Sequence, residues 1–445
     1  MKRATSPSAV LVFLALVWPK ADDSFFNLGP LHAAANWEVG EIESFGHDFH
    51  SGEVGGTKQV LDQTEVWFLE EANVAKFAQV FLGVGGTYFF FPPGNANNFA
   101  IGQRPSFGIT DAHADLDLWR LHDEDHRLLL RAGVFNFKYD ENVKDLGEYM
   151  FRTYTYPNTI YTGGLVLLNN ARTQLNGLDA NCKIVGFEND LLLTVKTDQV
   201  PSRTLSLTDL VSYNYHKILT VGGGLMFDNL YDPTEISNGT QVITPPYTDY
   251  YVLSNGEVIL GQNYLPPGST VVDQGHYTFR GEKLMLRGTV NMGKLLSHPV
   301  FSDKDFLIYS EGVVLGLKDY PGFYDKFWQR ALLMIGFNIP TFGLLDLLSI
   351  ETEYSNNPYS NDTYHAESSF APIPFTSNGG FINTNGHVFK WMAFAQKHLG
   401  QYFTITGQVA NDHLREIDYF GNYSTVEILP LRKNWYWAFQ FSYSN

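Results

Sequence analysis

Cysteine is almost absent from this 445-residue sequence: Cys182 stands alone, so no disulfide can form within the chain. Long apolar runs are scarce as well. After residue 21, no run reaches the about 20 apolar residues that a membrane-spanning helix needs. Stability must therefore come from buried area and hydrogen-bonded strand pairing. Any crossing of a membrane would require a closed β-barrel, because an open sheet leaves backbone polar groups unpaired in lipid.

Basic residues are outnumbered by acidic ones. The chain has 30 Lys and Arg against 47 Asp and Glu, which gives a formal charge of −17. Loss of Lys2, Arg3 and Lys20 with an N-terminal leader would remove three positive charges and leave −20. A nucleic-acid partner would require a basic surface, so the composition argues against one.

The N-terminus has the pattern of a secretory signal peptide. Lys2 and Arg3 give a positive start, residues 9–18 form a ten-residue apolar run, and Pro19-Lys20-Ala21 breaks it. The run is too short to span a bilayer as a helix. We predict a signal peptide over residues 1–21, export through the Sec pathway, and a single mature domain over residues 22–445.

Aromatic residues are plentiful, at 15 % of the chain, and residues 435–444 concentrate them. Every second position in this stretch is aromatic: Trp435, Trp437, Phe439, Phe441 and Tyr443. A period of two indicates a strand with one apolar and one polar face. Such a row of aromatics suits a surface that crosses lipid and meets both headgroup zones. The alternative is an inner strand of a large soluble β-protein.

The same alternation occurs over residues 102–121 and 127–137. One face of the first segment carries Ala112, Ala114, Leu116 and Leu118, and the other carries Asp111, His113, Asp115 and Asp117. The polar turn at 122–125 predicts a hairpin that brings Arg127 and Arg131 to the acidic face. His113 could act as a proton relay or metal ligand, but a solvated histidine among carboxylates is the favoured interpretation.

Further alternating segments recur along the chain. We expect strands at 35–45, 64–72, 77–91, 159–168, 172–183, 189–197, 205–214, 216–228, 284–292, 304–318, 326–339, 348–354, 387–399 and 404–409. Their number predicts an all-β, transmembrane antiparallel β-barrel of about 16 strands, with a range of 14–18. Short turns near 122–125, 214–215 and 399–401 contrast with long segments at 138–158, 229–270, 355–386 and 413–432. This asymmetry is typical of short periplasmic turns and long external loops.

The signal peptide, the alternating strands, the long loops and the aromatic last strand together resemble a Gram-negative outer-membrane porin-type β-barrel. The last strand offers Phe439, Phe441 and Tyr443, although the chain ends in Asn445 rather than in an aromatic. The resemblance implies an outer-membrane location. The partners that it implies are outer-membrane lipid and lipopolysaccharide, the barrel-assembly machinery and small polar solutes. A homo-oligomer is compatible with it.

Enzyme motifs are missing from the sequence. It contains no G-x-S-x-G, H-E-x-x-H, P-loop or C-x-x-C pattern. His47 and His50 near Glu53 are only a weak metal pattern, so we expect no metal and no cofactor. An outer-membrane hydrolase is the less favoured alternative to a protein without enzymatic activity.

We therefore expect a channel for passive diffusion of small polar solutes, with a non-conducting structural, adhesin or surface-receptor barrel as the alternative. The alternation predicts these pore-lining residues: Asp111, His113, Asp115, Asp117, Arg127, Arg131, Lys196, Arg287, Glu351 and Glu353. Residues 138–158 mix charges with aromatics, so we expect them to fold inward as a constriction, with an external loop packed on its neighbours as the alternative. Its charged and aromatic candidates are Asp140, Lys144, Glu148, Arg152 and Tyr154. The acidic excess predicts a weak preference for cations.

Overall fold

The computed structural model describes residues 27–44, 60–75, 77–90, 103–119, 126–155, 160, 173–195, 204–231, 241–243, 250–252, 258–260, 276–277, 280–296, 305–317, 324, 326–357, 387–414, 429 and 434–445. Within these residues, no helix combines the length and the apolar character needed to cross a membrane. The predicted signal peptide, Lys196, and His47, His50 and Glu53 lie outside the described residues.

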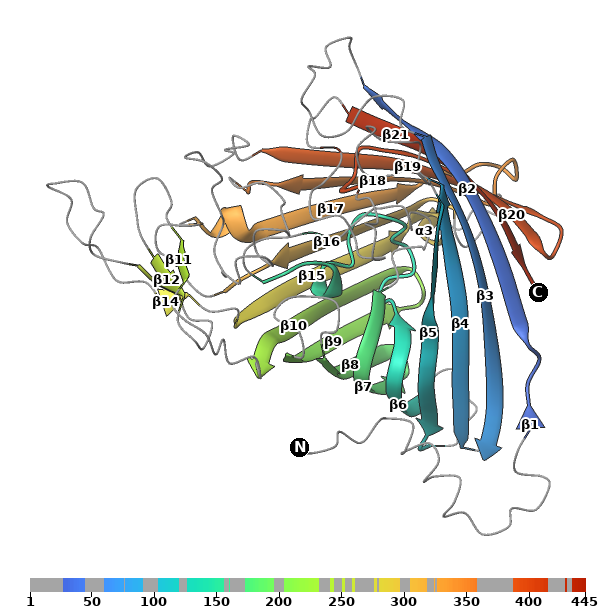
Figure 1. Ribbon diagram of the computed structural model, residues 1–445, viewed down its shortest axis with the longest axis horizontal. Coiled ribbons are helices and arrows are strands. Elements are labelled where there is room, and N and C mark those ends of the chain that lie inside the picture. The colour runs from blue at the N-terminus through green and yellow to red at the C-terminus, as the bar shows by residue number, and fades with distance from the viewer. Residues whose placement is uncertain are drawn as a thin grey trace, which may run out of the picture.

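Sixteen antiparallel strands form one closed barrel (Figure 1). They are β2 (His32–Ser44), β3 (Val60–Ala75), β4 (Ala78–Phe90), β5 (Gln103–Asp117), β6 (His126–Phe137), β7 (Thr173–Ile184), β8 (Phe187–Val195), β9 (Leu205–Tyr215), β10 (Leu219–Tyr231), β15 (Gly281–Asn291), β16 (Leu307–Val314), β17 (Ala331–Asn338), β18 (Leu347–Ser355), β19 (Val388–Leu399), β20 (Phe403–Ala410) and β21 (Asn434–Ser444). Each strand pairs with the next, and β21 closes the barrel on β2 from Ala34↔Ser444 to Ser44↔Asn434. The expected count of 16 strands is confirmed.

The remaining elements are short. β1 (Asn27–Leu28) extends the first strand along β3, helix α3 (Met292–Leu296) follows β15, and the 3-10 helix η2 (Phe327–Arg330) precedes β17. Within the expected loop at 229–270, a small second sheet begins: β11 (Gln241–Ile243), β12 (Tyr250–Val252) and β13 (Val258–Leu260) pair in order, followed by β14 (His276–Tyr277).

The connections differ between the two ends of the barrel. Because the strands run up and down in sequence order, alternate connections lie at the same end. At one end β7 and β8 are joined by Val185 and Gly186, and β9 and β10 by residues 216–218. At the other end the connections include residues 138–172, 232–280 and 356–387. The predicted asymmetry between short turns and long loops is therefore present.

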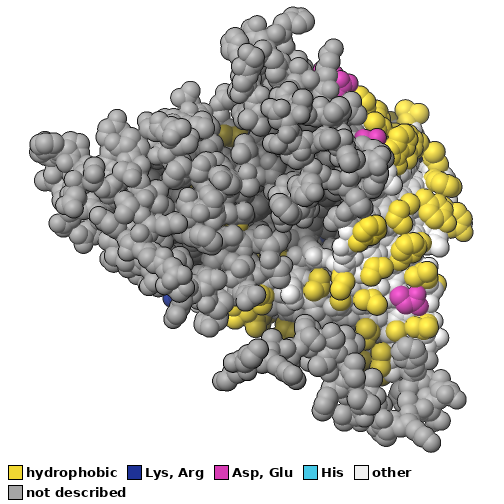
Figure 2. Space-filling model, in the orientation of Figure 1, with side chains coloured by type: hydrophobic (Ala, Val, Ile, Leu, Met, Phe, Trp, Pro, Cys, Tyr) yellow, Lys and Arg dark blue, Asp and Glu magenta, His cyan; other side chains and the backbone are white. Residues whose placement is uncertain are grey.

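The outer surface is apolar because the strands alternate as the sequence indicates. On β21, Phe439 and Phe441 are exposed outside, whereas Tyr436 and Ala438 are fully buried inside. Trp37 on β2 stacks on Phe441 with ring centroids 5.6 Å apart. Figure 2 shows hydrophobic side chains over much of the described outer surface on the side of β2–β5. A closed barrel with this surface is suited to lipid.

A β-bulge shifts the alternation inside β5. Gly83 of β4 pairs with Asp111 and Val84 pairs with Ile109, so Thr110 has no pairing partner on that side. Before the bulge the outward side chains are at odd positions, Phe107 and Ile109, and after it they are at even positions. The extra residue thereby directs Asp111 and the acidic positions after it into the barrel.

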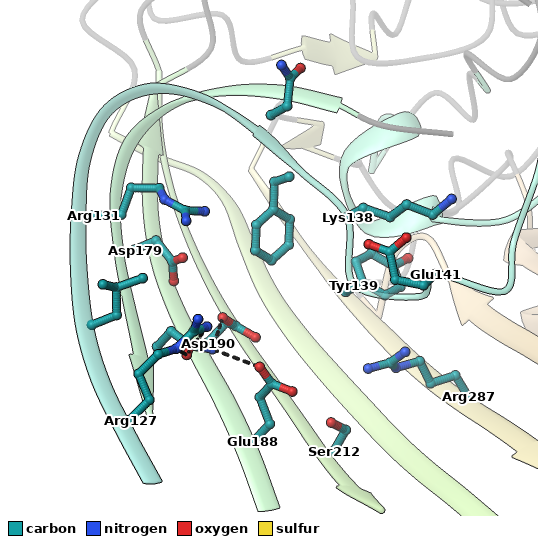
Figure 3. A pocket seen from close by; sticks show the side chains of 14 residues that line it. Arg127, Arg131, Lys138, Tyr139, Glu141, Asp179, Glu188, Asp190, Ser212 and Arg287 are labelled. Carbon is teal, nitrogen blue, oxygen red and sulfur yellow. Dashed lines mark hydrogen bonds between the residues drawn. The ribbon is translucent and has the colours of Figure 1, made fainter. Parts of the chain in front are cut away.

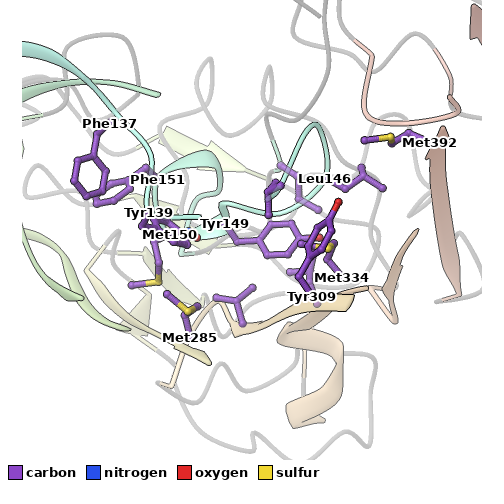
Figure 4. Packing of buried hydrophobic residues seen from close by; sticks show 14 of the residues in the cluster. Phe137, Tyr139, Leu146, Tyr149, Met150, Phe151, Met285, Tyr309, Met334 and Met392 are labelled. Carbon is purple, nitrogen blue, oxygen red and sulfur yellow. The ribbon is translucent and has the colours of Figure 1, made fainter. Parts of the chain in front are cut away.

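Residues 138–155 leave the end of β6 and lie against the inner wall of the barrel (Figure 1). They include helix α2 (Tyr149–Arg152), whose residues are all buried. Figure 4 shows Leu146, Tyr149 and Met150 packed near Met285, Tyr309 and Met334 of the wall strands. A cluster of buried apolar side chains therefore joins this inner segment to the inward-facing residues of the wall strands.

Candidate functional site

The inner segment, residues 138–155, turns sharply before its helix. Gly147 has φ +100° and Glu148 has φ 56°, both in the left-handed region. A Cβ on Gly147 would lie 2.7 Å from the methyl carbon of Met334, so glycine allows both the turn and the close approach to the wall. Earlier in the segment, the Asp140 carboxylate accepts the backbone N–H of Asn142 at 3.0 Å.

A carboxylate of the wall holds the middle of the inner segment. Glu351 on β18 accepts the backbone N–H groups of Lys144 at 2.6 Å, Asp145 at 3.0 Å and Leu146 at 2.8 Å. The Tyr309 hydroxyl on β16 donates to the same carboxylate at 2.7 Å. Four donors therefore compensate the charge of a side chain that is fully buried.

A second wall carboxylate holds the start of helix α2. Glu311 on β16 accepts the backbone N–H groups of Glu148 at 2.8 Å and Tyr149 at 3.0 Å, and the Tyr139 hydroxyl at 2.6 Å. These contacts supply a negative charge to N–H groups that the helix itself leaves unpaired.

Two further wall side chains bind the end of the segment. Glu353 on β18 accepts the Tyr149 hydroxyl at 2.5 Å and contacts His413 Nε2 at 2.7 Å. Lys283 on β15 donates to the carbonyls of Met150 at 2.8 Å and Thr153 at 2.5 Å. The inner segment is thus attached to strands that lie up to 207 residues away in the sequence.

Several ionisable groups of the inner segment have shifted pKa values. Burial, together with the charge of Glu311, raises the pKa of Glu148 well above its usual range. Burial and the nearby Asp412 carboxyl raise the pKa of Asp145 in the same direction. Burial, followed by the charge of Lys144, lowers the pKa of Lys138 to about 8. The Lys138 ammonium therefore titrates close to neutral pH.

A cavity of about 400 Å³ remains between the inner segment and the wall (Figure 3). We call it the eyelet. It is lined by Arg127, Leu129, Arg131, Asn136, Phe137, Lys138, Tyr139, Glu141, Asp179, Asn181, Glu188, Asp190, Ser212 and Arg287. Four of these residues are basic and four are acidic.

The wall side of the eyelet comes from β6, β7 and β8. Arg131 forms a bidentate ion pair with Asp115: its Nε lies 2.9 Å from Oδ1 and its Nη2 lies 3.0 Å from Oδ2. Asn181 accepts from Arg127 at 2.7 Å and donates to Asp190 at 2.7 Å. It also donates to Glu188 at 3.2 Å, so one amide links a guanidinium to two carboxylates.

The opposite side comes from the inner segment and β15. Arg287 lies 3.6 Å from the Asp140 carboxylate and 5.5 Å from the centre of the Tyr139 ring. Lys138 donates to the Val143 carbonyl at 2.5 Å. In Figure 3, Lys138, Tyr139, Glu141 and Arg287 face the residues of β6–β8 across the opening.

The acidic face predicted on β5 points into the barrel. His113 lies 3.7 Å from both Asp111 and Asp115, stacks on Phe81 at 4.5 Å and has its edge toward Phe135. Asp117 is on the same face, opposite Leu129. Among the described residues, no group of three His, Cys, Asp or Glu side chains could hold a metal ion. The histidine is thus packed between aromatic rings and carboxylates.

Two of the expected pore-lining residues are covered by the inner segment. Glu351 and Glu353 point inward, but they are 0 % and 1 % exposed because the inner segment covers them. Their carboxylates accept hydrogen bonds from that segment. Arg127, Arg131 and Arg287 do line the eyelet.

Most of the residues proposed for the constriction are buried and do not line the eyelet. Asp140, Glu148, Arg152 and Tyr154 are at most 8 % exposed. Glu148 accepts the Tyr139 N–H at 3.1 Å and Arg152 donates to the Asp145 carbonyl at 2.7 Å, so both stabilise the segment itself. Lys144 binds the Glu141 carbonyl at 2.6 Å. The edge of the opening is formed instead by Lys138, Tyr139 and Glu141.

The sequence reasoning missed Asp179, Asn181 and Glu188, which line the wall side of the eyelet. A signal was present, because residues 178–183 alternate between Leu178, Ala180 and Cys182 on one face and Asp179, Asn181 and Lys183 on the other. In the structure the polar set faces inward, with Asp179 opposite Arg131 and Asn181 opposite Leu129.

Comparison with known proteins finds similarity in structure only. No family model matches the sequence, and no curated protein matches it either. Salmonella typhi OmpF in complex with daunomycin has a TM-score of 0.47 and 10 % identity, over 96 % of this chain and 99 % of that chain. Pseudomonas putida OprB has a TM-score of 0.46 and 10 % identity, over 95 % of this chain and 94 % of that chain. A mutant of Rh. blastica porin has a TM-score of 0.42 and 8 % identity, over 94 % of this chain and 100 % of that chain.

The architecture is established by the strand pairing of this chain itself. Sixteen strands close between β2 and β21, their apolar side chains face outward, and the segment after β6 is bound to the inner wall. The chain is a closed antiparallel β-barrel of 16 strands with a segment bound to its inner wall.

Proposed function

We propose that this protein is an outer-membrane channel for passive diffusion of small polar solutes, without enzymatic activity. The observation that carries the proposal is the eyelet, a charged cavity between the barrel wall and the inner segment. Charges of both signs favour polar solutes over apolar ones, and a cavity of about 400 Å³ favours small ones.

The outer-membrane location is supported by the apolar outer surface of the barrel. Side chains such as Leu286, which is 67 % exposed, would face acyl chains, and outward aromatics such as Phe441 would meet lipid. The partners that we propose are outer-membrane lipid and lipopolysaccharide, with the barrel-assembly machinery acting on the last strand. Cell fractionation and heat-shifted gel mobility test the location. Recovery in the periplasm, with mobility unchanged by heating, would contradict it.

Ion selectivity should be weak. The eyelet has four basic and four acidic residues, so its local charges largely cancel. The excess of acidic residues over the whole chain still favours cations at long range, and salt screens this field beyond about 8 Å at physiological ionic strength. We propose a weak preference for cations that increases at low salt. The reversal potential in a KCl gradient measures it, and an anion-selective sign would contradict it.

Conductance of the purified protein in planar bilayers tests the channel directly. Stepwise current increases after addition of protein are expected, with heat-denatured protein as the control. Folded protein that inserts without conducting would support the alternative, a structural, adhesin or receptor barrel.

A further inference from the structure

We propose that the eyelet binds small zwitterionic amines, with their ammonium group on Asp179 and their carboxylate toward Lys138 and Arg287. This inference rests on the proposed channel function and adds a class of solute to it. The juxtaposition that carries it is a buried carboxylate with an unpaired oxygen on one side of the opening and two basic side chains on the other side (Figure 3).

Asp179 is the most unusual side chain of the eyelet. It is 2 % exposed, yet within the described part of the chain its Oδ1 oxygen accepts no hydrogen bond. A buried carboxylate oxygen without a donor is costly, and most native carboxylates avoid that state. Asp179 lines the eyelet, and in Figure 3 its carboxyl group points toward the opening. A donor supplied by a solute would satisfy it.

The surroundings of Asp179 favour a cationic donor. Three carboxylates line the wall side of the eyelet: Asp179, Glu188 and Asp190. The two arginines on that side compensate them only in part. Arg131 is paired with Asp115 and also lies close to Asp179 and Asp190, and Asn181 holds the guanidinium of Arg127 at 2.7 Å. With Asp115 included, two guanidinium groups face four carboxylates on this side. The wall side is therefore negative, and an ammonium group can bring several donors to it.

The other side of the eyelet is less acidic. Lys138 and Arg287 line it together with Glu141, and Asp140, the ion-pair partner of Arg287, is buried next to them. The ion pair of Arg287 with Asp140 is long, at 3.6 Å, so the guanidinium retains donors for a second carboxylate. A solute with an ammonium group at one end and a carboxylate at the other end matches both sides at once.

The size of the cavity agrees with this class of solute. A volume of about 400 Å³ lies near the lower end of small-molecule sites, which are roughly 300–1,000 Å³. A zwitterion also carries no net charge, so the acidic excess of the whole chain neither attracts nor repels it. Any preference for a zwitterion over a neutral solute of similar size must then arise from the local arrangement of charges. Weak binding inside a pore raises flux as long as the solute can leave again.

The experiment is liposome swelling with the full-length protein. The probes are γ-aminobutyric acid, a zwitterion with separated charges, and erythritol, a neutral polyol of similar size. We expect γ-aminobutyric acid to enter at least about threefold faster than erythritol. Asp179→Asn should abolish this difference, measured as the ratio of the two entry rates. Glu71→Gln is the matched control, because Glu71 on β3 binds Gln79 at 2.9 Å and does not line the eyelet.

The outcomes separate the two claims. If neither probe enters, the channel function fails. If both probes enter at equal rates in the unmodified protein, or if Asp179→Asn retains the difference, the channel stands and the zwitterion site is overturned. Heat-shifted mobility checks that each variant folds. Should Asp179→Asn not fold, Glu188→Gln removes one charge from the same wall, and an unchanged preference in that variant would overturn the proposal.

Discussion

The hydroxyl of Tyr139, at the start of the inner segment, donates a 2.6 Å hydrogen bond to the carboxylate of Glu311 on β16, 172 residues further along the chain. Glu351 on β18 receives three backbone N–H groups of the same segment. Acidic side chains of the wall therefore hold the segment inside the barrel. Without these contacts the same carboxylates would face the interior of the barrel, so the inner segment reduces the acidic charge exposed there.

Glu351→Ala should loosen the inner segment. The substitution leaves three buried N–H groups without an acceptor, and each such group costs roughly 1–3 kcal/mol. We expect single-channel currents with more noise and a higher mean conductance, because the segment leaves its position part of the time. Glu71→Ala on β3 is the control, since its carboxylate contacts Gln79 rather than the inner segment. Currents of Glu351→Ala that match those of the control would show that Glu351 does not hold the segment.

Leu286→Lys should destabilise the barrel in lipid. Leu286 is in the middle of β15 and faces outward, and a basic residue on the lipid face costs about 2–4 kcal/mol near the bilayer centre. Thr289→Lys, on the inner face of the same strand, should cost much less. Urea unfolding of the two variants in lipid vesicles measures the difference. Equal losses of stability would mean that the outer face of β15 does not meet lipid.

Cation preference should increase between pH 7 and pH 9. The pKa of Lys138 is about 8, lowered by burial from its usual value, so the ammonium loses its charge within this interval. Because the pKa in the folded state lies below that of the unfolded chain, stability should also rise with pH from about 8 until the unfolded lysine titrates near 10.4. Reversal potentials in a KCl gradient measure the selectivity.

Lys138→Arg separates this effect from other titrations, because arginine keeps its charge throughout the interval. We expect its selectivity to be constant from pH 7 to pH 9. An equal change with pH in the unmodified protein and in Lys138→Arg would assign the effect to another group.

The barrel itself could be predicted from the sequence because its strands form by local pairing. Hairpin neighbours such as Asp115 and Arg131 are close in sequence, so alternation and turn positions were enough to place them on one face. The bulge at Thr110 is also visible in the sequence, because the apolar positions change from odd to even numbers around it.

The position of the inner segment could not be derived in this way. Its partners, Lys283, Glu311, Glu351 and Glu353, are 130–207 residues away, and no local pattern links them to residues 138–155. One signal was available, because Leu192 on β8 interrupts an otherwise polar inner face. Leu192 is fully buried in the structure and belongs to the same apolar cluster as Tyr149 and Met150. Apolar residues on the inner face of a barrel strand thus indicate wall that another part of the chain covers.

Single-channel conductance of a variant lacking residues 141–153 tests the central claim most directly. The deletion removes Glu141 and helix α2, which together form much of the segment between the eyelet and the opposite wall. Glu71→Ala again serves as the control, with folding of each variant checked by heat-shifted mobility. If the inner segment narrows a conducting pore, the deletion variant should show a clearly larger conductance than the full-length protein. An unchanged conductance in a folded deletion variant would contradict the account.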